Sequence, residues 1–167
     1  MKKTFIIISI ILIINMIFAG CSNSYNISEE LKEAPEMKLE YTIDEKTTKV
    51  TVNHGTSSWK YSNGDGMFTN IESDSAHPLD SVKFIPLIEK TNELKELIIS
   101  FSLTQDSYTV RRWTDNYIGN EDAYENYYEN LELKGNTIVL PDDEQGYIYE
   151  VHATWPQGDA YYAFYVK

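Results

Sequence analysis

The chain has 167 residues, with 14 lysine and arginine residues against 26 aspartate and glutamate residues. This length fits one domain with a single hydrophobic core. The formal net charge of −12 argues against nucleic acid as a partner and favours a cationic ligand, although acidity can also serve solubility alone.

The N-terminus has the three zones of a secretory signal peptide. Lys2 and Lys3 form a cationic start, an apolar stretch follows as far as Ala19, and small residues precede Cys21. The apolar stretch covers about 16 positions, fewer than the roughly 20 that a membrane-spanning helix needs. Residues 1–20 are therefore predicted to be a signal peptide and not part of the fold.

Phe18-Ala19-Gly20-Cys21 resembles the lipobox of bacterial lipoproteins, in which the cysteine receives a diacylglyceryl group and the signal peptidase cuts before it. Phe18 stands where leucine is usual. The resemblance implies a mature chain that begins at Cys21, the only cysteine, and is held by lipid on the outer face of the cytoplasmic membrane. An ordinary secreted protein and an uncleaved anchor are the alternatives.

Loss of Lys2 and Lys3 with the signal peptide leaves 12 basic against 26 acidic residues, a net charge of −14. This charge should repel anionic lipid headgroups, so we expect the domain to stand off the membrane. Residues 21–36 are polar, with almost nothing to bury, and are predicted to form a flexible tether.

From residue 37 to residue 167 the dominant pattern is alternation with period two, interrupted by turn residues, which indicates β-strands. The expected hairpins turn at residues 45–47, 62–66, 105–107, 134–136 and 156–159. Asn63-Gly64-Asp65-Gly66 supplies the residues that tight hairpin turns require. In the last hairpin, Tyr149 and Val151 alternate with Glu150 and His152.

Seven or eight short strands, each with one apolar face, predict two antiparallel sheets packed face to face. We expect an all-β, immunoglobulin-like sandwich. The run from Leu140 to Tyr149 also resembles the corner of immunoglobulin-like domains, where a tyrosine hydroxyl bonds back to the loop backbone. The segment 120–128 fits either a short helix or a long acidic loop.

Three further motifs are similar to those of a group of small Firmicute lipoproteins. They are Trp59-Lys60-Tyr61 before the glycine-rich turn, Asp74-Ser75-Ala76-His77-Pro78, and the closing run from Tyr149 to Pro156. The resemblance spans most of the mature domain. It implies no particular activity.

Metal-site patterns are weak. Residues 61–72 place a glycine and a glutamate as in a calcium loop, but Tyr61 occupies the first ligand position and a hairpin turn explains the same glycines. His54, His77 and His152 are too far apart in sequence to show a ligand spacing. No serine or cysteine lies in a glycine-rich elbow, so neither catalytic residues nor a cofactor or metal is expected.

Aromatic residues gather beside two arginines in the segment that the sandwich core explains least. Exposed tyrosines suit binding surfaces, and arginine can grip a carboxylate or stack on a ring. These rings can equally cover one end of the core, and the arginines can merely balance nearby acids. The candidate binding residues are Arg111, Arg112, Trp113, Tyr117, Tyr124, Tyr127 and Tyr128.

The leading functional hypothesis is a lipid-anchored, non-enzymatic binding module outside the cytoplasm, whose partner is a protein or a small molecule of the cell envelope. The alternative is a metal-dependent or enzymatic accessory factor of the envelope that uses the histidines and acidic loops. A purely structural role is a third possibility.

Overall fold

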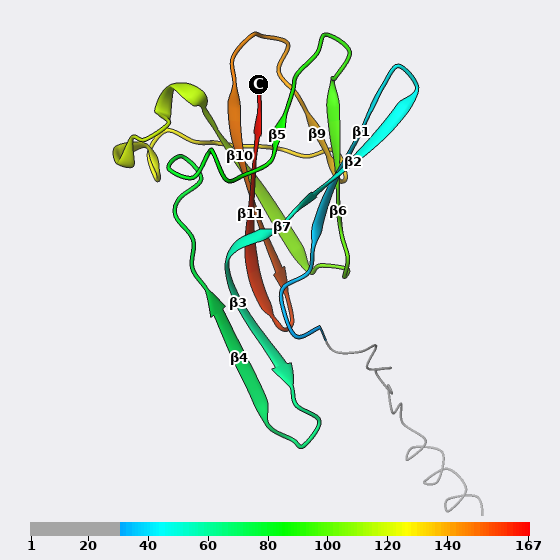
Figure 1. The fold of residues 1–167 in the computed structure, drawn as a ribbon, viewed down its shortest axis with the longest axis vertical. Coiled ribbons are helices and arrows are strands. Elements are labelled where there is room, and N and C mark those ends of the chain that lie inside the picture. Colours follow the sequence, from blue (N-terminus) through cyan, green and yellow to red (C-terminus); the bar gives the residue numbers. More distant parts are fainter. Residues whose placement is uncertain (1–30) are drawn as a thin grey trace, which may run out of the picture.

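Residues 31–167 are described by the computed structural model, and they form two β-sheets packed as a sandwich (Figure 1). The predicted signal peptide, Cys21 and most of the predicted tether lie outside these residues. The strands are β1 (Met37–Ile43), β2 (Lys46–Val52), β3 (His54–Ser62), β4 (Phe68–Ser73), β5 (Leu87–Ile88), β6 (Glu96–Phe101), β7 (Ser107–Thr114), β8 (Glu129–Asn130), β9 (Thr137–Val139), β10 (Tyr147–Trp155) and β11 (Gly158–Val166).

The predicted all-β sandwich is confirmed, with more strands than the seven or eight expected: residues 31–167 contain eleven. Three of them, β5, β8 and β9, have only two or three residues, too few to show a periodicity in the sequence. The immunoglobulin-like topology stays a prediction.

One sheet has four strands in the order β2-β1-β6-β9, and the other has the order β4-β3-β11-β10-β7-β8, with β5 paired to β11. All pairs are antiparallel except β5 with β11. The centre of the larger sheet is the β10–β11 hairpin, whose nine-residue strands pair along their whole length. Only Pro156 and Gln157 connect them, so the turn is shorter than the predicted 156–159, and Gly158 and Asp159 belong to β11.

The first hairpin turns one residue earlier than expected. Asp44 and Glu45 connect β1 to β2, with φ angles of 50° and 61°. Two successive positive φ angles define the tight turn whose twist matches that of paired strands. The β3–β4 hairpin has the predicted glycine-rich turn and projects away from the sandwich (Figure 1).

Two of the predicted hairpins are wrong in their pairing. At residues 105–107 the chain passes from β6 of the smaller sheet to β7 of the larger sheet, so these strands do not pair. The segments on either side of residues 134–136 do not form a hairpin either. Only a single bridge joins Lys134 to Thr137, and β9 pairs instead with β6. The reason is Asn136, whose carbonyl accepts a hydrogen bond from Ile99 N (2.8 Å) and whose side chain donates to Ile99 O (3.0 Å). These bonds direct the chain onto the edge of the smaller sheet.

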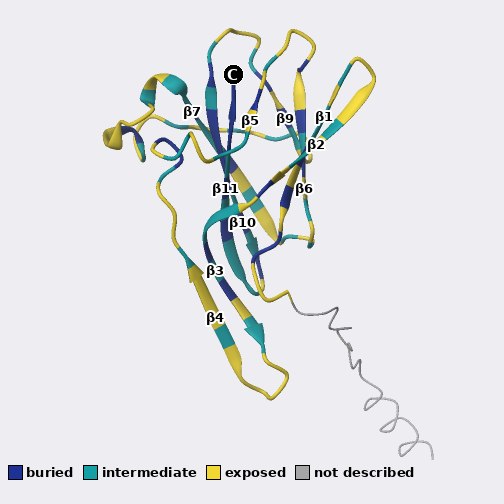
Figure 2. Ribbon diagram, viewed as in Figure 1, coloured by how far each residue is buried: buried dark blue, intermediate teal, exposed yellow. Residues whose placement is uncertain are grey.

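The main core lies between the sheets (Figure 2). Val151, Tyr149 and Phe164 of the larger sheet face this core, where Leu39 and Ile99 of the smaller sheet are buried. Tyr149 and Phe164 stack with ring centroids 4.9 Å apart. The Tyr149 hydroxyl is buried without a hydrogen-bond partner, so the expected tyrosine-corner bond is not made by this residue.

A second, smaller core lies on the outer face of the larger sheet. Trp113 and Ile148, neighbours across β7 and β10, are buried there with Leu79, Ala123 and Tyr165. The cover consists of the segment 74–86 and the segment 115–128, which contains the 3-10 helices η1 (Asp115–Tyr117) and η2 (Glu121–Ala123). The segment 120–128, which the sequence leaves open between a short helix and a loop, contains one single-turn 3-10 helix, η2, followed by turns.

The ordered domain starts before residue 37. Trp59 Nε1 donates to the carbonyl of Leu31 (2.8 Å), and Tyr162 Oη donates to that of Pro35 (2.5 Å). Ala34 is buried in the main core. The last six residues of the predicted tether therefore pack on the sandwich, because their carbonyls accept bonds from buried aromatic side chains.

Candidate functional site

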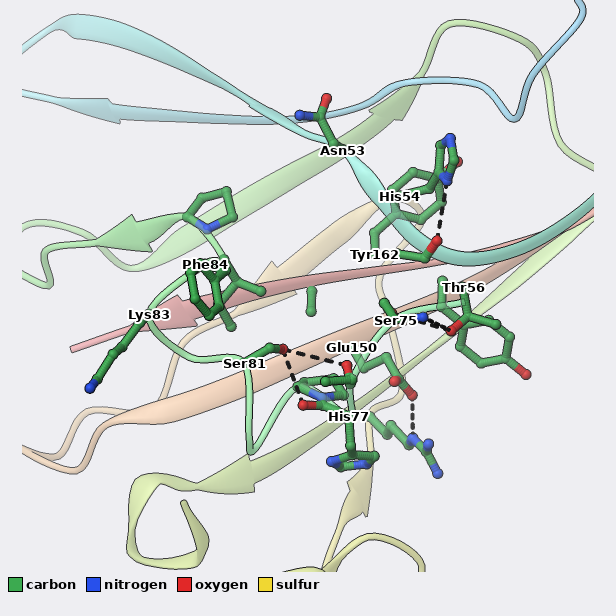
Figure 3. Close-up of a pocket in the computed structure, with 18 of the residues that line it drawn as sticks. Asn53, His54, Thr56, Ser75, His77, Ser81, Lys83, Phe84, Glu150 and Tyr162 are labelled. Carbon is green, nitrogen blue, oxygen red and sulfur yellow. Dashed lines mark hydrogen bonds and ion pairs between the residues drawn. The ribbon is translucent and has the colours of Figure 1, made fainter. Parts of the chain in front are cut away.

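A groove of about 770 Å³ lies on the outer face of the larger sheet, beside the second core (Figure 3). Its floor is formed by β10, β11 and Arg111 of β7, one side by the beginning of β3, and the other by the segment 75–86. The groove lies where the segments 74–86 and 115–128, which cover the outer face of the sheet, come to an end. Concave sites of this size, with a few polar groups among apolar ones, are typical of ligand binding.

The floor of the groove contains an ion pair. Glu150 and Arg111 are paired in register across β10 and β7, and Arg111 Nε lies 2.6 Å from Glu150 Oε2. Arg111 also contacts Glu125 (3.3 Å), and its guanidinium lies 4.8 Å from the ring centroid of Trp113. Glu150, expected on a polar outer face, is only 6 % exposed, because the outer face is partly covered.

Burial and charge act in opposite directions on this pair. Burial raises the pKa of Glu150 and outweighs the attraction of Arg111, which lowers it. Burial lowers the pKa of Arg111, but Glu150 and then Glu125 raise it by more, so it lies above its ordinary value. Arg111 is therefore held charged by two carboxylates, while Glu150 depends on Arg111 to stay ionised.

His77 joins the groove to the aromatic cluster. Its ring stacks on Tyr124 at 3.8 Å between centroids and meets the edge of Trp113 at 5.1 Å. His77 Nδ1 accepts a hydrogen bond from Leu79 N (3.3 Å), which assigns the proton to Nε2. That Nε2 is buried and has no partner within residues 31–167.

Desolvation, followed by the charge of Arg111, lowers the pKa of His77. The imidazole is therefore neutral at pH 7 and offers one unsatisfied N–H donor. Tyr124 is fixed in turn, because its hydroxyl donates to Asp80, a bond that raises the pKa of Tyr124 to about 12.

The walls of the groove are mixed in character. Phe84 is 88 % exposed on the 75–86 segment, beside Lys83. On the floor, Tyr161 stacks on His152 at 4.1 Å between ring centroids, and His152 Nε2 lies 3.2 Å from Asp159. Exposure of an apolar ring to water is unfavourable, so an exposed phenylalanine in a concavity indicates a surface for contact with another molecule.

The two candidate arginines point to different sites. Successive residues of a strand face opposite sides, so Arg111 lies on the outer face and Arg112 on the inner face of β7. Arg112 Nε donates to Glu129 (2.8 Å), and its guanidinium lies 4.5 Å from the ring centroid of Tyr147. Only Arg111 lines the groove.

The predicted aromatic cluster divides into a buried and an exposed part. Trp113 is 1 % exposed and donates through Nε1 to Ala123 O (2.8 Å), so it is a core residue and not the exposed contact that a binding loop requires. Tyr128 packs its edge on Trp113. Tyr117 and Tyr127 stack at 5.0 Å between centroids, and Tyr127 is 54 % exposed.

Sequence reasoning did not single out Glu150, Phe84 or Tyr161 as site residues. The overlooked signal was Leu79, Val82 and Ile85, three apolar residues spaced by three in a segment otherwise rich in turn residues. These side chains pack in or against the second core. They fix the segment on the sheet and thereby form the wall of the groove.

The sequence motifs considered for metal have other roles in the fold. Asp65 Oδ1 accepts a hydrogen bond from Met67 N (3.0 Å), and Glu72 Oε1 accepts one from Ser58 Oγ (2.9 Å), both within the β3–β4 hairpin. His54 and His77 line the groove. Residues 31–167 contain no group of three or more His, Cys, Asp or Glu side chains arranged to hold a metal ion.

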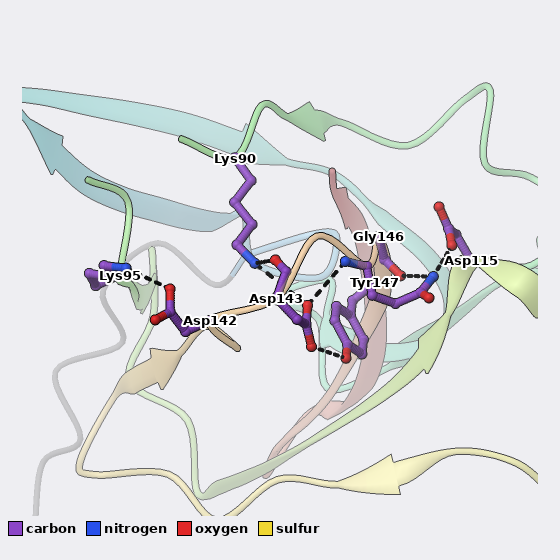
Figure 4. Close-up of polar contacts among 8 residues, drawn as sticks. Lys90, Lys95, Asp115, Asp142, Asp143, Gly146 and Tyr147 are labelled. Carbon is purple, nitrogen blue, oxygen red and sulfur yellow. Dashed lines mark hydrogen bonds and ion pairs between the residues drawn. The ribbon is translucent and has the colours of Figure 1, made fainter. Parts of the chain in front are cut away.

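A second hollow, of about 330 Å³, is lined by residues of the loop before β10. That loop lies at the end of the sandwich opposite the β3–β4 hairpin (Figure 1), and Figure 4 shows its polar contacts. Four of the charged residues that line the hollow are paired with one another: Lys95 lies 2.9 Å from Asp142, and Lys90 lies 3.7 Å from Asp143. Asp143 also accepts a hydrogen bond from the Tyr147 hydroxyl (2.9 Å). These contacts fix the loop before β10.

Compared with protein-family models, with curated proteins and with solved structures, the chain matches none of them. In the part of the chain that the structure describes, no helix is both long and apolar enough to cross a membrane.

Proposed function

We propose that this protein is a lipoprotein anchored through Cys21 on the outer face of the cytoplasmic membrane, and that its sandwich domain is a non-enzymatic binding module. The observation that carries the proposal is the groove of about 770 Å³. Its features suit a ligand, protein segment or small molecule, that has both an apolar and a hydrogen-bonding part.

Three properties of the groove support binding. Phe84 provides apolar area that is almost wholly accessible, and its burial by a ligand is favourable. His77 lines the groove and its Nε2–H has no partner in the described residues, but this atom is buried, so a ligand acceptor satisfies it only when the ring turns toward the groove. The Arg111–Glu150 pair is already desolvated, so its position is fixed before a ligand arrives.

The test uses capture from the native envelope by the lipidated protein, followed by measurement of the affinity of each purified, identified partner. Phe84→Ser should weaken binding without loss of stability, because Phe84 is exposed. Leu87→Ser is the matched control, since Leu87 is a 57 % exposed apolar residue that does not line the groove. Equal affinities of both variants and the wild type would contradict the groove as the binding site.

The same preparation distinguishes the binding module from the alternative, a metal-dependent accessory factor. A metal-dependent accessory factor should contain stoichiometric metal, and its activity should depend on His54, His77 or His152 and not on Phe84. The anchor is tested independently, because Cys21→Ala should move the protein from the membrane fraction to the soluble extracytoplasmic fraction.

A further inference from the structure

The β3–β4 hairpin carries an apolar tip that the groove does not use. Met67 is 63 % exposed, Phe68 is 62 % exposed and Ile71 is 39 % exposed. The hairpin projects from the sandwich and its outer half is exposed (Figures 1 and 2). Adjacent exposed apolar side chains on one projection mark a contact surface more clearly than the same residues scattered singly.

The chain outside the described residues joins the domain beside this hairpin. Leu31, the first described residue, accepts a hydrogen bond from Trp59 of β3. From Trp59 the strand runs outward to the turn at Gly64, a projection of about 17 Å at the usual rise per strand residue. The tether and the tip therefore lie at the same end of the molecule.

The chain between Cys21 and Leu31 is long enough for the lipidated cysteine and the hairpin tip to reach the same membrane surface. The ten steps from Cys21 to Leu31 span at most about 36 Å when fully extended, which is more than the projection of the hairpin. A lipid-anchored chain can therefore rest the hairpin tip on the membrane that holds its cysteine.

We propose that the tip of the β3–β4 hairpin, through Met67 and Phe68, is a second membrane contact that docks on the lipid surface in which Cys21 is anchored. This proposal rests on the lipid anchor of the proposed function. Apolar side chains at the tip enter the boundary between headgroups and acyl chains, as interfacial segments do.

The charge distribution fits end-on contact and not contact of the whole domain. The net charge of −14 repels the body from anionic lipid, whereas the tip from Ser62 to Phe68 carries a single charged residue, Asp65, whose carboxylate caps Met67 N. Lys60 places its ammonium 4.6 Å from the Phe68 ring centroid, where it can meet lipid phosphates. The body stands off the membrane while the tip contacts it.

The test is depth-dependent quenching by brominated phosphatidylcholine in vesicles that carry the full-length, lipidated protein. The native tryptophans, Trp59, Trp113 and Trp155, are at most 4 % exposed, so they contribute little quenching. Phe68→Trp places a reporter at the tip, and Val139→Trp is the matched control at a 57 % exposed apolar position in the other sheet.

The tryptophan at position 68 should lose fluorescence and shift to shorter wavelength on brominated vesicles, whereas the one at position 139 should not. Equal quenching at both positions in a vesicle-bound, lipidated protein would overturn the membrane contact and leave the anchor intact. A blue shift at position 68 that depends on protein concentration and not on lipid would assign the tip to a second copy of the chain, and would also overturn it. Absence of lipid on Cys21 would overturn both proposals.

Discussion

Removal of Arg111 should cost the protein much of its stability, because the buried Glu150 carboxyl must then either stay ionised without its partner or take up a proton. Arg111→Met keeps the side-chain stem over Trp113 and removes the 2.6 Å contact with Glu150. Loss of one member of a buried pair costs 3–5 kcal/mol, and we expect about 3 kcal/mol here, because Arg111 is partly exposed. Urea denaturation at pH 7 measures this loss, which corresponds to a melting temperature lower by roughly 6–12 °C.

The pH dependence identifies the cause. The pKa of Glu150 is above its ordinary value of 4.5 in the folded state, and loss of Arg111 should raise it further. The stability that this carboxyl contributes is therefore complete below its ordinary pKa and is lost as the pH rises through the folded value. Arg111→Met should regain stability as the pH is lowered from 7, relative to the wild type.

The double variant Arg111→Met/Glu150→Gln provides the control, because it contains no carboxyl at position 150. It should be more stable than Arg111→Met at pH 7 and should lack the additional pH dependence. A loss below about 1 kcal/mol in the single variant, with the pH profile of the wild type, would refute the assigned dependence of Glu150 on Arg111.

Three further substitutions test the packing. Trp113→Ala should lower the free energy of unfolding by about 3–5 kcal/mol, measured in urea, because the ring is buried in the second core; a change below 1 kcal/mol would contradict that core. Gly158→Ala should cost roughly 1–3 kcal/mol, since a Cβ there would lie 1.9 Å from Ser58 O; an unchanged melting temperature would show that β11 can move from β3. Tyr127→Ala should stay within about 0.5 kcal/mol of the wild type by thermal denaturation, and a larger loss would mean that its stack on Tyr117 supports the fold.

Strands with long, regular alternation could be predicted from the sequence. In the β10–β11 hairpin, alternation continues through both strands up to the proline-containing turn, so local pattern and final pairing agree. Residues 131–140 contain equally alternating side chains, but Asn136 bonds to Ile99, far away in the sequence, and this contact decides the pairing of β9. A local sequence pattern cannot show that a distant strand will pair with this segment in place of its neighbour in the sequence.

The site was predictable only in part, because it depends on which face of the sheet is covered. Arg111 was identified from its aromatic neighbours, but its partner Glu150 is 39 residues away and meets it through strand register alone. Trp113 and Tyr127 look alike in the sequence as aromatic residues of one segment. The apolar side chains of the 74–86 segment bury the first and leave the second exposed.

The position of β11 has a consequence for how the protein is made. The last strand of the chain lies in the interior of the larger sheet, with β3 on one side and β10 on the other. Neither that sheet nor the groove on it can be completed until β11 has been made, since non-local strand pairing must wait for its partner. Under the proposed export, the larger sheet would therefore close only after Gly158–Val166 has left the translocation pore.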